Sequence, residues 1–192
     1  MAERKPLALV AGRSYSEEIP AGDYFPLSGL PSASGGRRDW GASATDPVGT
    51  PSDGDAYYNT VLDMLMEYDS TRAKWLSVES AIFYFGRAAN TAPGSYYKGV
   101  DGVTLGAATG WNAFHNGTVV ALAYTRDDSD SATFEVTNDG ASLATVASAA
   151  ISGKDVTLNA DFSADEILAV RNQAGGNATT NVQGWVKLRW RV

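Results

Sequence analysis

The stretch GDAYYNTVLDMLMEYDSTRAKWLSV, residues 54–78, fits two different folds. As a helix, it would place apolar residues on one face, with Asp63 and Glu67 one turn apart like a metal-binding or acid pair. As strands, it would contain two turns rich in Asp, Asn, Ser and Thr. The strands would be residues 56–59, 64–68 and 74–78. A helix would favour an enzyme, whereas strands would favour a scaffold.

The composition of the whole chain favours strands. Of the 192 residues, 44% are hydrophobic and only 19% are charged, while 20 are glycine. This mixture is typical of many short strands joined by many turns. A chain of this length can bury roughly two thirds of the surface that it exposes when unfolded. We therefore expect one main domain with an appendage.

Beyond residue 80, apolar and polar side chains alternate as in half-buried antiparallel strands. Residues 184–192 show the pattern most clearly, because one face is apolar and the other is mostly basic. The apolar face holds Val186, Leu188, Trp190 and Val192; the other face holds Trp185, Lys187, Arg189 and Arg191. Further strands are expected at residues 81–85, 118–125, 132–137, 142–147, 155–162 and 166–170. About seven or eight strands at this spacing predict a β-sandwich.

The N-terminal residues 1–28 read as a small hairpin, with Leu7 and Leu9 on its first strand and Ile19 opening a Pro-Ala-Gly-Asp turn. A two-stranded ribbon of this size is marginal in water, so we expect it to dock on something else.

Residues 29–55 are rich in Gly, Pro and Ser, lack periodic apolar residues and predict a flexible linker. Trp40 lies within this linker and is expected to anchor it on a neighbouring surface, or else to contact a ligand. We group Trp40 with Leu7, Leu9 and Ile19 as candidate attachment residues. A chain that begins near Thr50 is expected to remain folded.

Several classes of site and partner are disfavoured by the composition. The chain has no cysteine and a single histidine, which removes zinc-cysteine sites and the usual multi-histidine metal sites. Its net charge of −7 would repel the phosphates of nucleic acids. The N-terminal apolar run, Leu7 to Ala11, is too short for a secretory signal or a membrane span. We expect no cofactor, no nucleic acid and no membrane insertion.

Two further stretches contain candidate site residues. Asp127, Asp128 and Asp130 crowd one connection and could hold calcium, but their spacing lacks the Gly and the distal Glu of a recognised calcium loop. His115 lies between Trp111 and a turn, without a companion nucleophile or histidine in the sequence pattern. We expect an ordinary acidic loop and a histidine packed on aromatic rings.

The basic stripe of Trp185, Lys187, Arg189 and Arg191 has three interpretations. It could be a solvated edge whose charges prevent aggregation. It could be a subunit contact, for example with the Asp127 to Asp130 loop of a neighbouring copy. It could also bind sugars or phosphates of a cell surface.

Three sets of motifs resemble virion appendage proteins of tailed bacteriophages. PSDGDAYYNT, MEYD and KWLSV resemble a small three-stranded module of such proteins, and KPLALVAGRSYSEEIPAGD is similar to segments that open phage fibres. FHNGTVVALAYT and FSADEILAV resemble paired strands of jelly-roll-like modules, although the glycine expected between Ala164 and Asp165 is missing. Each motif is short, but in this order they cover most of the chain.

The resemblance implies an all-β protein and favours strands in residues 54–78. Asp63, Glu67 and Asp69 would then be turn and surface residues. The expected domains are an attachment arm at 1–28, a linker at 29–55, a small three-stranded β-meander at 56–80 and a jelly-roll-like antiparallel β-sandwich at 81–192.

The resemblance also implies a function. We expect a non-enzymatic structural protein on the virion surface, made in the host bacterial cytoplasm: a homotrimeric head fibre or capsid decoration protein anchored by its N-terminus. Its partners would be itself and capsid, neck or tail components. The alternative is a tail-fibre tip that binds host glycans through exposed Trp and Tyr. An enzyme such as a depolymerase ranks third, because it would normally need a larger parallel β-helix and paired carboxylates in a groove.

Overall fold

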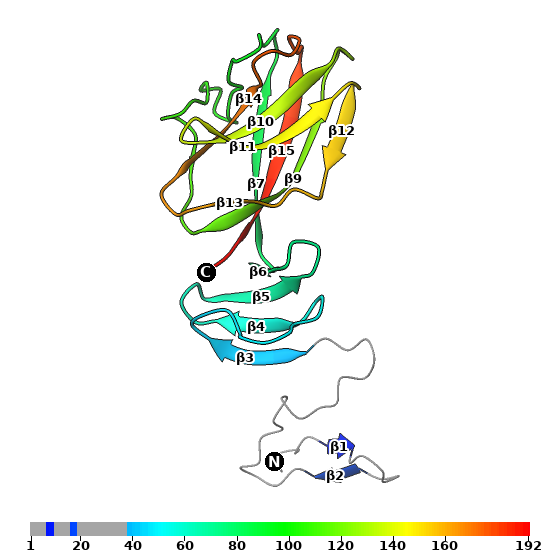
Figure 1. Cartoon of the computed structure of the whole chain (residues 1–192), viewed down its shortest axis with the longest axis vertical. Coiled ribbons are helices and arrows are strands. Elements are labelled where there is room, and N and C mark those ends of the chain that lie inside the picture. Colours follow the sequence, from blue (N-terminus) through cyan, green and yellow to red (C-terminus); the bar gives the residue numbers. More distant parts are fainter. Residues whose placement is uncertain (1–6, 10–15, 19–37) are drawn as a thin grey trace, which may run out of the picture. The chain divides into compact units, whose positions relative to one another are not determined.

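The computed structural model describes residues 7–9, 16–18 and 38–192, which fall into two units, residues 1–36 and 37–192. In the first unit, β1 (Leu7–Leu9) pairs antiparallel with β2 (Ser16–Glu18), in agreement with the predicted hairpin (Figure 1). Ile19, one of the candidate attachment residues, lies outside the described residues.

Residues 54–78 form strands, as the resemblance implied. The strands β4 (Ala56–Asn59), β5 (Met64–Asp69) and β6 (Lys74–Ser77) pair antiparallel in chain order. One face of this small sheet packs Tyr57, Met66 and Trp75 into a core of its own. The described part of the chain contains no α-helix, and the all-β prediction is confirmed.

In the stretch of residues 54–78, the side chains of Asn59 and Asp69 stabilise the two turns and thereby exclude a helix. The amide oxygen of Asn59 accepts hydrogen bonds from the backbone N–H groups of Val61 and Leu62, at 3.0 and 2.8 Å. The carboxylate of Asp69 likewise accepts a bond from the N–H of Arg72. Such side-chain bonds offer the backbone an alternative to helical pairing, and they favour turns.

The prediction of a flexible linker over residues 29–55 is wrong for the second half of this range. β3 (Asp39–Ser43) pairs parallel with β4, so the module is a four-stranded sheet of order β3-β4-β5-β6. The cause is Asp55, whose buried carboxylate accepts bonds from the N–H of Arg38, the N–H of Ser52 and the indole N–H of Trp40. A folded chain must therefore begin before Arg38, not near Thr50.

The remaining strands build the sandwich. They are β7 (Ser80–Arg87), β8 (Trp111–Asn112), β9 (Gly117–Thr125), β10 (Ala132–Asn138), β11 (Ala141–Ser148), β12 (Ser152–Asp155), β13 (Ala160–Phe162), β14 (Ile167–Asn172) and β15 (Val182–Trp190). One antiparallel sheet has the order β11-β10-β14-β8; the other has the order β12-β9-β15-β7, with β13 also pairing with β9. The two sheets lie face to face and form the predicted β-sandwich (Figure 1).

The core between the two sheets is aromatic at its centre. Phe134 is fully buried and stacks on Tyr124 with ring centroids 4.4 Å apart. Its ring also lies 5.7 Å from that of Tyr97 and 6.0 Å from that of Phe85. These rings come from both sheets and from the connection after β7, and they hold the two layers together.

One predicted strand is broken in the structure. Residues 155–162 alternate in sequence, but only β12 and β13 at the two ends are strands. Val156 is 56% exposed, and the backbone carbonyls of Val156 and Leu158 accept bonds from the Arg72 guanidinium instead of from a strand. An arginine from outside the sandwich thus replaces the missing strand pairing.

Glu135 lies on the side of β10 opposite the core, yet it is only 2% exposed, and it pairs with Arg171 of β14. The hydrogen bond from Arg171 lowers the pKa of Glu135 below its usual 4.5, against desolvation, which would raise it. At pH values above the ordinary pKa of Glu135, the pair therefore contributes its full stabilisation of the folded state. This stabilisation is lost as the pH falls through the lowered pKa.

We expect the Glu135→Gln variant to lose less stability than the wild type when the pH is lowered from neutral into this acid range. The reason is that glutamine has no proton to bind. Melting temperatures measured across this range would check the prediction, and parallel profiles for the two proteins would contradict it.

Candidate functional site

Three residues of the basic stripe, Trp185, Lys187 and Arg189, lie on one face of β15 (Val182–Trp190), and Arg191 follows the strand. Val186 and Leu188 face the core, so Trp185, Lys187 and Arg189 face outward on the same sheet. We call this surface, the side of the β12-β9-β15-β7 sheet that faces away from the core, the outer face. Within the described residues, the side chains of Arg189 and Arg191 form hydrogen bonds or ion pairs, whereas those of Trp185 and Lys187 form neither.

Arg189 is bound to the small sheet. Its guanidinium donates hydrogen bonds to the backbone carbonyls of Ser77 and Leu76, at 2.5 and 3.1 Å. It also lies 3.7 Å from the carboxylate of Asp69. The expectation that Arg189 forms part of a free basic stripe is therefore wrong, because its side chain joins the sandwich to β6.

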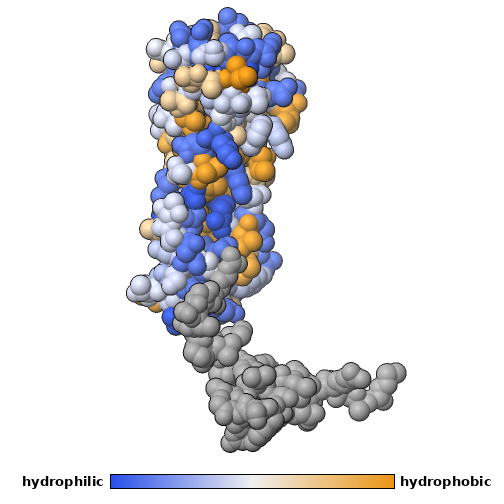
Figure 2. Space-filling model, turned by 90° about the vertical axis from the view of Figure 1, so that its right-hand side faces the viewer, coloured by the Kyte–Doolittle hydropathy of each residue, from blue (hydrophilic) through white to orange (hydrophobic). Residues whose placement is uncertain are grey.

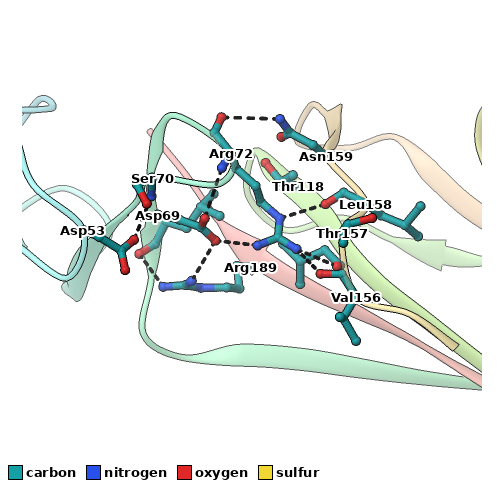
Figure 3. A network of polar contacts seen from close by, with 12 residues as sticks. Asp53, Asp69, Ser70, Arg72, Thr118, Val156, Thr157, Leu158, Asn159 and Arg189 are labelled. Carbon is teal, nitrogen blue, oxygen red and sulfur yellow. Dashed lines mark hydrogen bonds and ion pairs between the residues drawn. The ribbon is translucent and has the colours of Figure 1, made fainter.

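Arg72 completes this joint from the opposite direction (Figure 3). It lies in the turn between β5 and β6, and its guanidinium donates to the carbonyls of Leu158 and Val120, at 2.7 and 2.9 Å. Its side chain is 10% exposed and forms an ion pair with Asp69, which is 12% exposed. Asp69 is thus a largely buried anion between two arginines, not the surface residue that was expected.

A second ionic group lies beside the first. Lys74 of β6 pairs with Asp161 of β13 at 2.7 Å, and the hydroxyl of Thr118 donates to the same carboxylate. Arg191 lies 3.7 Å from Asp161. Desolvation acts to raise the pKa of Asp161, but the hydrogen bonds from Lys74 and Thr118 outweigh it, and the pKa is lowered. The small sheet and the sandwich are therefore fixed to each other by polar contacts.

Trp185 and Lys187 remain on the outer face, together with two residues of β7. Trp185 pairs with Tyr84, and Lys187 pairs with Ile82, across the β15–β7 ladder. Trp185 is 40% exposed, Tyr84 is 55% exposed and Ile82 is 47% exposed. We call Ile82, Tyr84 and Trp185 the upper patch.

The upper patch borders a groove of about 680 Å³. Its lining includes Tyr84, Trp185, Val100, Lys98, Arg87 and Gln183. Two exposed aromatic rings and an 80% exposed valine make the groove apolar, while two cations and an amide surround it. Exposed aromatic residues surrounded by polar groups are typical of interaction sites.

The acidic loop does not present free carboxylates as a group. Asp127 accepts a bond from the side-chain amide of Asn181, and Asp128 accepts one from the N–H of Thr180. Asp128 also forms an ion pair of 2.9 Å with the fully buried side chain of Arg126. Within the part of the chain that the structure describes, no three His, Cys, Asp or Glu side chains gather as a metal site would require.

His115 packs edge-on against Trp190, with ring centroids 5.9 Å apart, which agrees with the expected histidine on aromatic rings. Trp40, placed among the attachment residues from sequence, packs against Trp75 at 6.1 Å in the small sheet. Trp40 is therefore a local anchor, as one of its two interpretations held.

The residues that matter most at the joint were not found from the sequence. Arg72 and Asp161 stand in polar stretches without any distinguishing pattern, because their partners are remote in the chain. Tyr84 could have been found, since Ile82 and Tyr84 alternate with Phe83 and Phe85 in one strand. That alternation places two large apolar side chains on the face opposite the core.

Comparisons with models of protein families, with curated proteins and with solved structures gave no match. In the described residues there is no helix long and apolar enough to cross a membrane.

Proposed function

We propose that this protein is a structural, non-enzymatic component of a tailed-phage virion that assembles with copies of itself through the outer face. One observation supports the self-contact most directly. Tyr84 and Trp185 lie side by side, both strongly exposed, on a sheet whose other face is already packed into the core.

The composition of the outer face suits a protein partner. Large aromatic side chains supply much of the binding energy of interfaces, and a polar rim excludes water around them. Here the rim carries Arg87, Lys98 and Lys187, in a chain whose net charge is −7. These polar groups can stay solvated around the aromatic centre of the contact.

The position in the particle and the number of copies follow from the phage resemblance. It implies a homotrimer, as a head fibre or capsid decoration protein on the virion surface, attached through residues 1–28 to capsid, neck or tail components. The two-unit division of the chain at residue 36 fits a separate attachment segment.

We expect a chain that begins at Arg37 to remain folded and assembled but to lose attachment to the particle. The reason is that this start keeps β3 and Trp40 and removes only the first unit. Incorporation can be measured by quantifying the protein in purified particles produced with the shortened gene. Normal occupancy would contradict the anchoring role.

A second candidate function is supported by the same groove. Exposed Tyr84 and Trp185, with Lys98 and Gln183 beside them, could stack on and hydrogen-bond a host glycan, as in a receptor-binding fibre tip. Saturable binding of the intact protein to one class of glycan, abolished in the Trp185→Ala variant, would favour this function.

The Trp185→Ala variant should weaken self-association by about tenfold or more, because an aromatic anchor at the centre of an interface is commonly worth more than 1.4 kcal/mol. The Arg191→Ala variant is the control. Arg191 lies near Asp161 and Gly117 of its own chain, so we expect its loss to affect assembly less.

Sedimentation of wild type and both variants over a range of concentrations would give the association constants. A Trp185→Ala protein that associates as tightly as wild type would remove the outer face from the subunit contact.

A further inference from the structure

The small sheet carries a second apolar patch on the face opposite its own core. Tyr58 of β4 is 41% exposed and pairs directly with Leu65 of β5, which is 44% exposed. The N–H of Val78 donates to the carbonyl of Leu65, and Val78 is 49% exposed. We call Tyr58, Leu65 and Val78 the lower patch.

The face of the small sheet that carries the lower patch adjoins the outer face of the sandwich at the joint. Side chains alternate along β5 and β6, so Asp69 and Lys74 lie on the face of Leu65, whereas Tyr68 and Trp75 pack on the other face. Asp69 and Lys74 in turn contact Arg189 and Asp161 of the sandwich.

Arg189 shares its face of β15 with Trp185, because residues at intervals of two lie on one side of a strand. The joint thus connects the face of the lower patch directly to the outer face. Because Arg72 and Arg189 bond to backbone carbonyls across the joint, the two patches are held in one fixed relation.

Hydrophobic residues form separate orange areas among hydrophilic ones over the side of the unit seen in Figure 2.

The upper patch alone is a small contact area. Stable interfaces bury about 800 Å² on each partner, whereas a half-exposed aromatic side chain contributes roughly 100 Å². Two such aromatic side chains and Ile82 together supply less than half of the required area.

We propose that the small sheet is part of the subunit contact: a second copy of this chain covers the lower patch and the upper patch together, with both copies pointing the same way. This inference rests on the proposed self-assembly. It adds the second contact surface and the parallel orientation, or polarity, of the copies. The small sheet then contributes to assembly and is not a spacer between the sandwich and the attachment segment.

The polarity follows from closed cyclic symmetry. Copies related by a rotation axis with three members all point in the same direction along that axis. A strip that spans both modules and faces this axis lies beside the same strip of its neighbours, upper patch beside upper patch and lower patch beside lower patch. In an antiparallel pair, by contrast, the two ends of the strip cannot both lie beside their own equivalents.

The absence of cysteine from the chain permits a direct test with single introduced cysteines. Leu65→Cys and Val78→Cys mark the lower patch, and Ile82→Cys marks the upper patch. Thr145→Cys is the control, because Thr145 is exposed and pairs with Glu135 on the far face of the other sheet. Each full-length variant is treated with a short bifunctional thiol reagent and examined on a denaturing gel.

We expect most of the protein to shift from the monomer band to the covalent dimer band for both patches, and the Thr145→Cys protein to stay monomeric. If Ile82→Cys is linked while Leu65→Cys and Val78→Cys are not, the small sheet lies outside the contact, and this inference fails while the proposed self-assembly stands. If the untreated wild type sediments as a monomer, the proposed function itself fails.

Discussion

The free energy of unfolding of the Arg72→Ala variant is expected to be about 3–5 kcal/mol lower than that of the wild type, because the substitution removes one partner of a largely buried ion pair. It leaves the carbonyls of Val120 and Leu158 without the donor that they have in the wild type, and Arg189 becomes the one remaining arginine beside Asp69 among the described residues. Unsatisfied buried acceptors add to the cost. Urea unfolding followed by tryptophan fluorescence would measure the change.

The matched control is Arg87→Ala, since Arg87 lies on β7 at the rim of the groove, away from the joint. We expect it to change the free energy of unfolding by less than about 0.5 kcal/mol, as for most surface substitutions. Equal effects of the two substitutions would show that Arg72 has no special part in joining the small sheet to the sandwich.

The free energy of unfolding of the Phe134→Ala variant is expected to fall by a comparable amount, about 3–5 kcal/mol. Truncation of a fully buried phenylalanine removes apolar surface from the core and leaves a cavity. Phe134 touches the rings of Tyr124, Tyr97 and Phe85, so the cavity would open at the centre of the sandwich. The same urea experiment measures the loss.

Phe114→Ala provides the matched control, because this phenylalanine is 82% exposed. It should leave the stability nearly unchanged. A loss for Phe114→Ala as large as that for Phe134→Ala would mean that the aromatic centre of the sandwich is not its main core.

The sandwich was largely predictable from the sequence because most of its strands carry their large apolar side chains on one face. In residues 132–137 and 184–192 a period of two indicates both the strand and the side that faces the core, whereas a register shift in β9 brings Val119 as well as Leu122 into the core. The small sheet was harder to predict, since Val61 to Tyr68 also has the composition of a helix. There the decision rests on Asn59 and Asp69, whose side chains bond to the backbone of the turns.

The errors share a physical cause. β3 depends on the carboxylate of Asp55, the break in residues 155–162 depends on Arg72, and the basic stripe is divided because Arg189 bonds to β6. Each is a polar contact between residues distant in the chain. Local periodicity carries no information about such contacts, so the candidate surface could be predicted only in part, through Trp185.

The central claim, that this chain assembles with itself through the outer face, is tested most directly by the mass of the wild-type protein in solution. Sedimentation equilibrium of the full chain measures this mass over a range of protein concentrations. The account predicts a discrete species with the mass of three chains. A single species with the mass of one chain, 20.2 kDa, at every concentration would contradict it.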